Sequence, residues 1–168
     1  MEVENLSCVV MELRILANYI TKVAKADLDR RLAEANMGVS SLQFLALVLL
    51  QQNNYTSKEL SRKLALEPAT LVPVVDSLER QGLVERCRDQ HDRRRIPLHL
   101  TESGRLLIRQ APLANEEDFI AQGLMALGPA KTGQLLALLN ELSRSISAED
   151  DDLDEMISLA QLFTLQPA

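Results

Sequence analysis

Four arginines and an aspartate are crowded into one short polar segment of the chain. Arg93, Arg94 and Arg95 follow one another, Asp92 directly precedes them, and Arg88 lies a few residues earlier. A planar guanidinium forms paired hydrogen bonds to phosphate oxygens and enters the narrow, negative minor groove of DNA. Asp92 can hold the guanidinium of Arg94 in a fixed orientation through a charge-assisted hydrogen bond. These residue types at this spacing favour phosphate recognition.

The sequence contains no arrangement that is typical of an enzyme. It has no glycine-rich phosphate loop, and no nucleophile is placed with a base and an orienting partner. His91 and His99 lack the neighbouring cysteine, histidine or carboxylate set that a metal site needs. We therefore expect a binding protein with no catalytic residues, no metal and no cofactor.

The charge of the chain is unevenly distributed. The whole chain has a net charge of −6, yet residues 56–109 carry eleven Lys and Arg against eight Asp and Glu. Residues 110–168 carry two Lys and Arg against ten Asp and Glu, so the acidic excess lies towards the end of the chain. Because salt screens distant charge beyond ~8–10 Å, a basic surface in the middle segment can bind phosphates although the molecule is anionic.

Length and composition indicate one globular domain, or one domain with a small appended one. The 168 residues are 46% hydrophobic and 25% charged, which excludes wholesale disorder. Two cysteines do not make a disulfide-rich scaffold, and no apolar run approaches the ~20 residues of a membrane span. The first residues are acidic instead of positively charged as in a signal peptide. We expect a cytoplasmic protein with no membrane partner.

Apolar periodicity predicts mostly helical structure. A long amphipathic helix covers about residues 6–35 and is ended by Gly38, and a buried helix begins near Ser40 or Ser41. Thr56-Ser57-Lys58-Glu59 has the capping-box pattern and predicts a short helix over 57–64. After a tight connection, a further helix is predicted from Pro68 to Gln81, ending at Gly82.

Two strands are predicted next, over residues 83–88 and 95–100, around the polar tip 89–94. Thr101 can cap a helix that Pro112 interrupts, and Gly128-Pro129 separates a final helix. Two closely connected helices followed by a basic-tipped hairpin form the order of a winged helix-turn-helix. A major groove about 12 Å wide admits one helix, and the hairpin can reach phosphates or the minor groove.

The predicted duplex-binding residues lie on the two connected helices and on the hairpin. The helix from Pro68 has no Lys or Arg before Arg80, so Thr70 is its best hydrogen-bonding candidate, and Ala69 and Val74 can contact thymine methyl groups. The candidates for DNA binding are Ser57, Lys58, Pro68, Ala69, Thr70, Pro73, Val74, Ser77, Arg88, Asp92, Arg93, Arg94 and Arg95.

Three motifs at this spacing resemble the MarR family of bacterial transcription regulators. They are Gly82-Leu83-Val84-Glu85-Arg86, then Asp92-Arg93-Arg94-Arg95, then Leu98-His99-Leu100-Thr101-Glu102-Ser103-Gly104. The resemblance implies a mainly α fold: a winged helix-turn-helix with a small β-hairpin wing, and a helical dimerisation region formed by N- and C-terminal helices. It also implies that Arg94, held by Asp92, reaches the minor groove.

The resemblance further implies a homodimeric repressor that binds a pseudo-palindromic operator in double-stranded DNA and is relieved by a small, often aromatic and anionic, ligand. Residues 1–36 and 104–146 would form the dimerisation region and residues 40–103 the DNA-binding domain. Residues 147–168 would be an acidic C-terminal extension with a short amphipathic segment. The expected dimerisation residues are Val9, Leu13, Leu16, Ile20, Leu135, Leu138, Leu139 and Leu142.

Two alternatives stay open at this point. The uncharged helix from Pro68 also suits a protein-interaction module that no longer binds DNA. A thiol-based redox-sensing repressor would use Cys8 or Cys87, although Cys8 lies about two turns too early to match the reactive cysteine of the family's hydroperoxide sensors.

Overall fold

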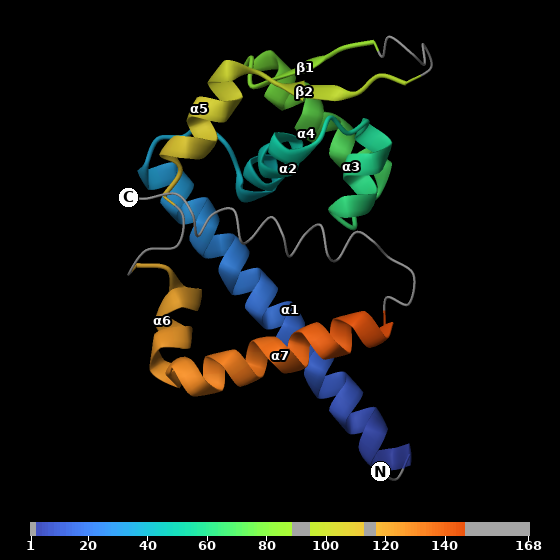
Figure 1. Ribbon diagram of the computed structural model, residues 1–168, viewed down its shortest axis with the longest axis vertical. Coiled ribbons are helices and arrows are strands. Elements are labelled where there is room, and N and C mark those ends of the chain that lie inside the picture. Colours follow the sequence, from blue (N-terminus) through green and yellow to red (C-terminus); the bar gives the residue numbers. More distant parts are fainter. Residues whose placement is uncertain (1–2, 89–94, 113–116, 147–168) are drawn as a thin grey trace. The chain divides into compact units, whose positions relative to one another are not determined.

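Helices and one small hairpin make up the parts of the chain that the structure describes. The computed structural model describes residues 3–88, 95–112 and 117–146 (Figure 1). In chain order the elements are α1 (Val3–Glu34), α2 (Ser41–Gln52), α3 (Ser57–Lys63), α4 (Pro68–Arg80), β1 (Val84–Arg86), β2 (Leu98–Leu100), α5 (Glu102–Gln110), α6 (Phe119–Leu127) and α7 (Pro129–Ile146). The predicted fold class, mainly helical with a small hairpin, is confirmed.

The described residues belong to two compact units. One contains α1 and α6, and the other contains α2 to α5 with the hairpin and is assigned α7. Within the described ranges, no helix combines the length and the apolar content needed to cross a membrane.

A buried charge cluster joins α1 to α6 in the first unit. Arg31, 6% exposed, pairs with Asp27 at 3.0 Å and with Asp118 at 2.7 Å. The same Asp118 caps α6 by accepting the backbone N–H groups of Ile120 and Ala121. Burial raises the pKa of Asp27, but the hydrogen bond from Arg30 and the charge of Arg31 outweigh it and leave that pKa below its usual value. The cluster therefore fixes where α6 begins against α1.

The second unit has a mainly apolar core to which α2, α3, α4, α5 and both strands contribute. From Ala46 to Leu50, α2 is buried continuously, as its nearly all-apolar sequence predicts. Fully buried side chains from the other elements complete the core: Leu60, Leu71, Val75, Leu78, Leu98 and Ile108.

The hairpin is short and is extended by a third segment. Val84 pairs with Leu100 and Arg86 with Leu98 in antiparallel register. On the other side of β2, Thr56 forms a bridge with Pro97, and the N–H of Leu98 donates to the carbonyl of Tyr55 at 2.8 Å. Pro97 lacks an N–H, but its carbonyl accepts from Cys87, so the hairpin continues beyond β1. The bridge attaches the hairpin to the segment before α3.

Three helices end in the same way, in a Schellman motif. After α1, α3 and α4 the left-handed position is taken by Asn36, Ala65 and Gly82, whose φ values are 54°, 51° and 68°. In each, the next N–H bonds to a carbonyl five residues back, as Leu66 does to Ser61 at 2.8 Å. The predicted stop at Gly82 is confirmed. The prediction that Gly38 ends the first helix is wrong, because Asn36 already turns the chain.

Thr101 and Gly104 lock the start of α5 onto the chain before β1. The Thr101 hydroxyl donates towards the carbonyls of Gly82 and Leu83 and accepts the N–H of Gly104 at 3.1 Å, so the predicted cap is confirmed. A Cβ on Gly104 would lie 2.3 Å from the Leu83 oxygen and 2.8 Å from Cδ1 of Leu100. Only glycine fits at this close approach of two backbone segments.

The substitution Gly104→Ala should lower the free energy of unfolding by about 2 kcal/mol or more, because backbone must move to admit the methyl group. Urea unfolding followed by circular dichroism measures the change. The matched control is Gly133→Ala on exposed α7, where a Cβ meets nothing within 4 Å. The control should be neutral or stabilising, and equal stability of Gly104→Ala and the wild type would contradict the close approach.

The substitution Ala65→Gly should raise the free energy of unfolding by about 0.5–1 kcal/mol. Alanine is strained at the positive φ of Ala65, whereas glycine is not, and this gain exceeds the entropy that glycine adds to the unfolded chain. Ala26→Gly, at an exposed position inside α1, serves as the opposite control and should cost about 1 kcal/mol. A loss of stability in both variants would argue against the left-handed turn after α3.

Candidate nucleic-acid interface

The start of α3 is held by a complete capping box. The Thr56 hydroxyl accepts the N–H of Glu59, and the Glu59 carboxylate accepts the N–H of Thr56 at 2.7 Å. The predicted pattern is therefore confirmed. Ser57 is half-buried and Lys58 is exposed in the first turn, so both predicted contact residues lie where the helix presents its N–H groups.

A four-residue connection places α4 after α3. Leu64 and Ala65 complete the Schellman turn, and Pro68 is the first residue of α4, where its missing N–H costs nothing. α3 and α4 are in contact, and α4 in turn contacts β1. The helix-turn-helix is thus a locally determined unit against which the hairpin packs.

α4 has one buried face and one exposed, uncharged face. Leu71, Val75 and Leu78 point into the core. Of the predicted contact residues, Pro68, Ala69, Thr70 and Pro73 are exposed, whereas Val74 and Ser77 are half-buried. Val72, 48% exposed, was not among the predictions. A helical-wheel projection of α4, which places Val72 away from the buried residues, could have identified Val72 from the sequence.

Arg86 clamps the hairpin onto α4. Its guanidinium binds the carboxylate of Asp76 at 2.6 Å and also that of Glu79. The two carboxylates lie one turn apart on α4, while Arg86 ends β1. The clamp offsets part of the negative charge of α4 and links that helix to the end of β1. Sequence reasoning missed this role, since Arg86 was considered only as part of a motif.

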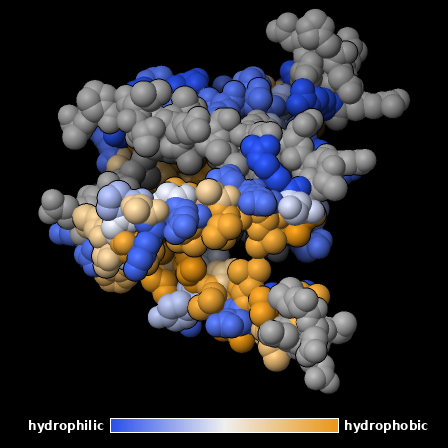
Figure 2. All heavy atoms as spheres, turned by 60° about the horizontal axis from the view of Figure 1, so that its bottom comes forward, coloured by the Kyte–Doolittle hydropathy of each residue, from blue (hydrophilic) through white to orange (hydrophobic). Residues whose placement is uncertain are grey.

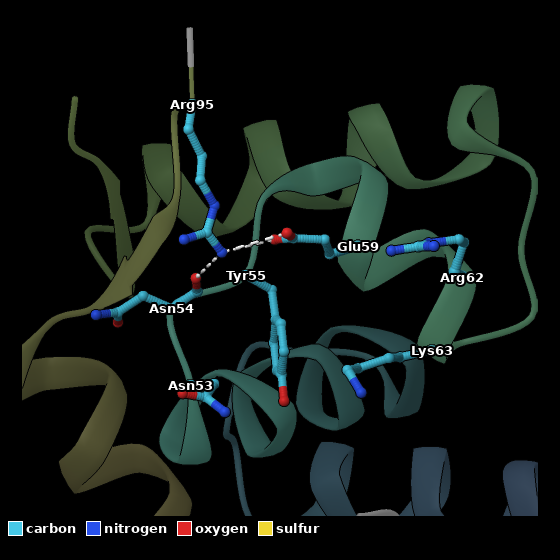
Figure 3. Close-up of a pocket in the computed structure, with 7 residues that line it drawn as sticks. All are labelled: Asn53, Asn54, Tyr55, Glu59, Arg62, Lys63 and Arg95. Atoms are coloured by element: carbon cyan, nitrogen blue, oxygen red, sulfur yellow. Dashed lines mark hydrogen bonds and ion pairs between the residues drawn. The ribbon is translucent and has the colours of Figure 1, made fainter. Parts of the chain in front are cut away.

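Arg95 also faces a carboxylate. Its guanidinium donates to the Glu59 carboxylate at 3.1 and 3.2 Å and to the Asn54 carbonyl at 3.5 Å (Figure 3). Burial raises the pKa of Glu59, whereas hydrogen bonds from the Thr56 N–H and from Arg95 lower it, and the net pKa lies below its usual value. Glu59 thus joins the segment that leads into β2 to the start of α3. Arg95 is a positioning residue in this structure.

The remaining hairpin candidates lie at or beyond the end of the described strand. Arg88 is exposed two residues after β1. Asp92, Arg93 and Arg94 lie outside the described residues, as does His91. His99 is half-buried in β2, and among the described residues no group of His, Cys, Asp or Glu could hold a metal ion.

The residues predicted for dimerisation form exposed apolar stripes on two helices. On α1 these are Val9, Leu13, Leu16 and Ile20, and on α7 they are Leu135, Leu138, Leu139 and Leu142. Each set recurs at helical spacing on one face of its helix. Figure 2 shows such apolar side chains, coloured orange, lying open at the surface.

Comparison with known proteins places the helix-turn-helix in a family. The family model described as "MarR family" matches residues 37–95. The organic hydroperoxide resistance transcriptional regulator of Bacillus subtilis is 34% identical over 112 residues, covering 66% of this chain and 71% of that protein. The transcriptional repressor NicR of Pseudomonas putida is 30% identical over 115 residues, covering 67% and 70%.

Solved structures share the fold. A mutant of Escherichia coli MarR in complex with operator DNA has a TM-score of 0.69 at 21% identity, covering 84% of this chain and 99% of that chain. CouR from Rhodococcus jostii RHA1, bound to p-coumaroyl-CoA, has a TM-score of 0.65 at 23% identity, covering 80% and 91%.

The matched proteins are transcriptional regulators, which are not enzymes, so the expectation of a non-catalytic protein is confirmed by its relatives. The helical fold with a small antiparallel hairpin matches MarR-type winged helix structures. The chain therefore belongs to the MarR family and is a DNA-binding transcriptional regulator.

Proposed function

We propose that the protein is a homodimeric repressor that binds a pseudo-palindromic duplex site and releases it when a small ligand binds. The observation that carries the DNA-binding role is the exposed face of α4, held at a defined angle by the Arg86 clamp on one side and by the capped α3 on the other. A helix fixed in this way can enter the major groove without first being ordered.

The proposed readout is divided between α4 and the wing. Thr70 donates to or accepts from base edges, while Ala69 and Val72 contact thymine methyl groups. The exposed face of α4 carries no cation before Arg80. The attraction to phosphate therefore falls to Ser57 and Lys58 on α3 and to the arginines of the hairpin. We assign Arg94, with Asp92 two positions before it in sequence, to the minor groove.

Dimerisation is proposed through α1 and α7, and we retain residues 1–36 and 104–146 as that region and 40–103 as the DNA-binding domain. Leu13 is 42% and Leu138 is 64% exposed, within stripes of large apolar side chains that a monomer rarely leaves in water. A second copy covers such a stripe symmetrically, and the two DNA-binding units then match two half-sites about one helical turn apart.

Ligand response is proposed from the kinship with CouR, a protein of this fold that was solved with p-coumaroyl-CoA. The alternative of a thiol-based redox sensor is disfavoured for Cys87. Burial and the nearby Glu85 carboxylate raise the pKa of the Cys87 thiol, whereas a reactive cysteine needs a lowered pKa. Cys8 is exposed on α1.

Selection of binding sites from random duplexes tests the central proposal. The wild-type protein should recover a two-fold symmetric site. Arg94→Ala should weaken binding to that site by about tenfold or more and reduce the salt slope by about one, because one guanidinium no longer displaces a counterion.

Arg105→Ala, on the exposed side of α5, is the matched control for this variant and should change the affinity by less than about twofold. Equal affinities of Arg94→Ala and the wild type at moderate salt would contradict the assignment of Arg94 to the minor groove. Failure of the wild type to recover any site would instead favour a protein-interaction module that contacts its partner through the apolar face of α4.

Leu138→Glu should convert the dimer to monomers or raise its dissociation constant by about 100-fold, since it buries a carboxylate in an apolar contact. Analytical ultracentrifugation measures the species present. Lys22→Glu, on the face of α1 opposite the stripe, is the control and should leave the dimer intact. A wild-type protein that sediments as a monomer at micromolar concentration would contradict the proposed interface.

A further inference from the structure

The contact between Arg95 and Glu59 holds the segment that leads into β2 at the start of α3 (Figure 3). One guanidinium nitrogen of Arg95, Nη2, lies 3.2 Å from Oε1 and 3.1 Å from Oε2 of Glu59. Arg95 directly follows Arg94, which we assign to the minor groove, and lies three residues before β2. The contact with Glu59 therefore restrains the chain next to Arg94.

The carboxylate of Glu59 is oriented independently of Arg95. One of its oxygens accepts the N–H of Thr56 at 2.7 Å, and Thr56 in turn forms a β-bridge with Pro97. A partly exposed ion pair usually contributes little to stability, because two long side chains must be ordered to form it. Here the capping box orders the carboxylate, and the bridge between Thr56 and Pro97 brings Arg95 close to it. The cost of forming this ion pair is therefore lower than that of a pair between two free side chains.

Glu59 is an anion in the part of α3 that we assign to phosphate contacts. It lies in the same first turn of α3 as Ser57 and Lys58. A carboxylate at such a place repels the phosphates of a duplex, so its removal alone would strengthen DNA binding. The effect of Glu59 through Arg95 has the opposite sign, because an arginine of the hairpin adds affinity only where the hairpin meets the groove correctly. The two effects can be told apart by the direction of the change.

We propose that Glu59 is a positioning residue for DNA binding: although it is negatively charged, it raises the affinity for duplex DNA by holding the segment that leads into β2 against α3. That segment is then ordered in the free protein, so binding does not have to order it. The other strand is held separately, since Arg86 links the end of β1 to α4. The inference rests on the proposed function, in which the hairpin contacts the duplex.

Glu59→Gln tests this proposal. Glutamine keeps an oxygen for the Thr56 N–H at this position of the capping box but loses the charge that binds Arg95. The full-length protein is titrated onto the fluorescein-labelled duplex recovered by selection, and the affinity is measured by fluorescence anisotropy at constant salt concentration. Glu59→Gln should weaken binding by at least about fivefold, because the charge-assisted contact with Arg95 is lost. Repulsion alone predicts tighter binding.

Glu102→Gln is the matched control. Glu102 is exposed at the start of α5 and pairs with Arg109 at 2.9 Å and with Arg105 at 3.5 Å, both on the same helix. The substitution removes one negative charge from the same unit and breaks ion pairs that connect no two elements. The affinity of this variant should therefore stay within about twofold of the wild type.

A double-mutant cycle with Arg95→Gln separates positioning from a general effect on α3. Where Arg95 is absent, Glu59 has no guanidinium to hold, so adding Glu59→Gln should leave the affinity equal or higher. A loss of the same size with and without Arg95 would place the effect in the cap of α3 and overturn the proposal. Arg95→Gln alone leaves the capping box intact and tests the same contact if Glu59→Gln loses its circular dichroism signal. Wild-type affinity of Arg95→Gln would then overturn the proposal.

The remaining outcomes distinguish this inference from the proposed function. Equal or tighter binding by Glu59→Gln in the otherwise wild-type protein overturns the positioning role alone, and so does an equal loss in Glu102→Gln, which would mean a general effect of charge. Failure of the wild type to bind any duplex would overturn the proposed function and the positioning role together.

Discussion

The carboxylate of Glu59 connects parts of the second unit that lie far apart in the sequence. One of its oxygens accepts the Thr56 N–H at the start of α3, and the carboxylate also accepts hydrogen bonds from Arg95, three residues before β2. The same segment is tied to β2 through the bridge between Thr56 and Pro97. Because these contacts all involve either Glu59 or Thr56, the start of α3 and the segment that leads into β2 form one junction. The lowered pKa of Glu59 extends towards acid the pH range over which this carboxylate stays paired.

Further polar contacts attach the hairpin to α4 and α5. Arg86 connects β1 to α4, and the Thr101 hydroxyl with the close approach at Gly104 connects α5 to the chain before β1. The hairpin is therefore attached to α3, α4 and α5 by polar contacts placed around a mainly apolar core. Apolar packing sets the compactness of the unit, whereas these directional contacts determine the angles between its elements.

Local signals explain which parts of this architecture could be predicted. The capping box at Thr56, the stop at Gly82 and the cap at Thr101 depend on residues within a few positions of one another, so their sequence patterns suffice. The end of α1 was misassigned because Asn36 takes a left-handed conformation as glycine does. The pairing of Arg31 with Asp118, which are 87 positions apart, and the clamp of Arg86 on α4 depend on tertiary packing. Periodicity carries no information about such contacts. Among the site residues, Ala69 and Thr70 are exposed whereas Val74 is half-buried, a difference that the helical pattern alone did not reveal.

The uncharged exposed face of α4 has a thermodynamic consequence for the proposed complex. In a recognition helix that bears arginines, the same side chains attract the phosphates of any duplex and distinguish one base pair from another. Ionic strength then changes both the affinity and the specificity. Here the cations lie on α3 and the hairpin, while α4 offers a hydroxyl and methyl groups. Counterion release at the phosphate contacts then contributes almost equally to right and wrong sites and largely cancels from their ratio, so that Arg94 in the minor groove is left as the one cation that takes part in the comparison. A change in salt concentration should therefore alter how much of the regulator is bound to DNA more than it alters the preference of the regulator among sites.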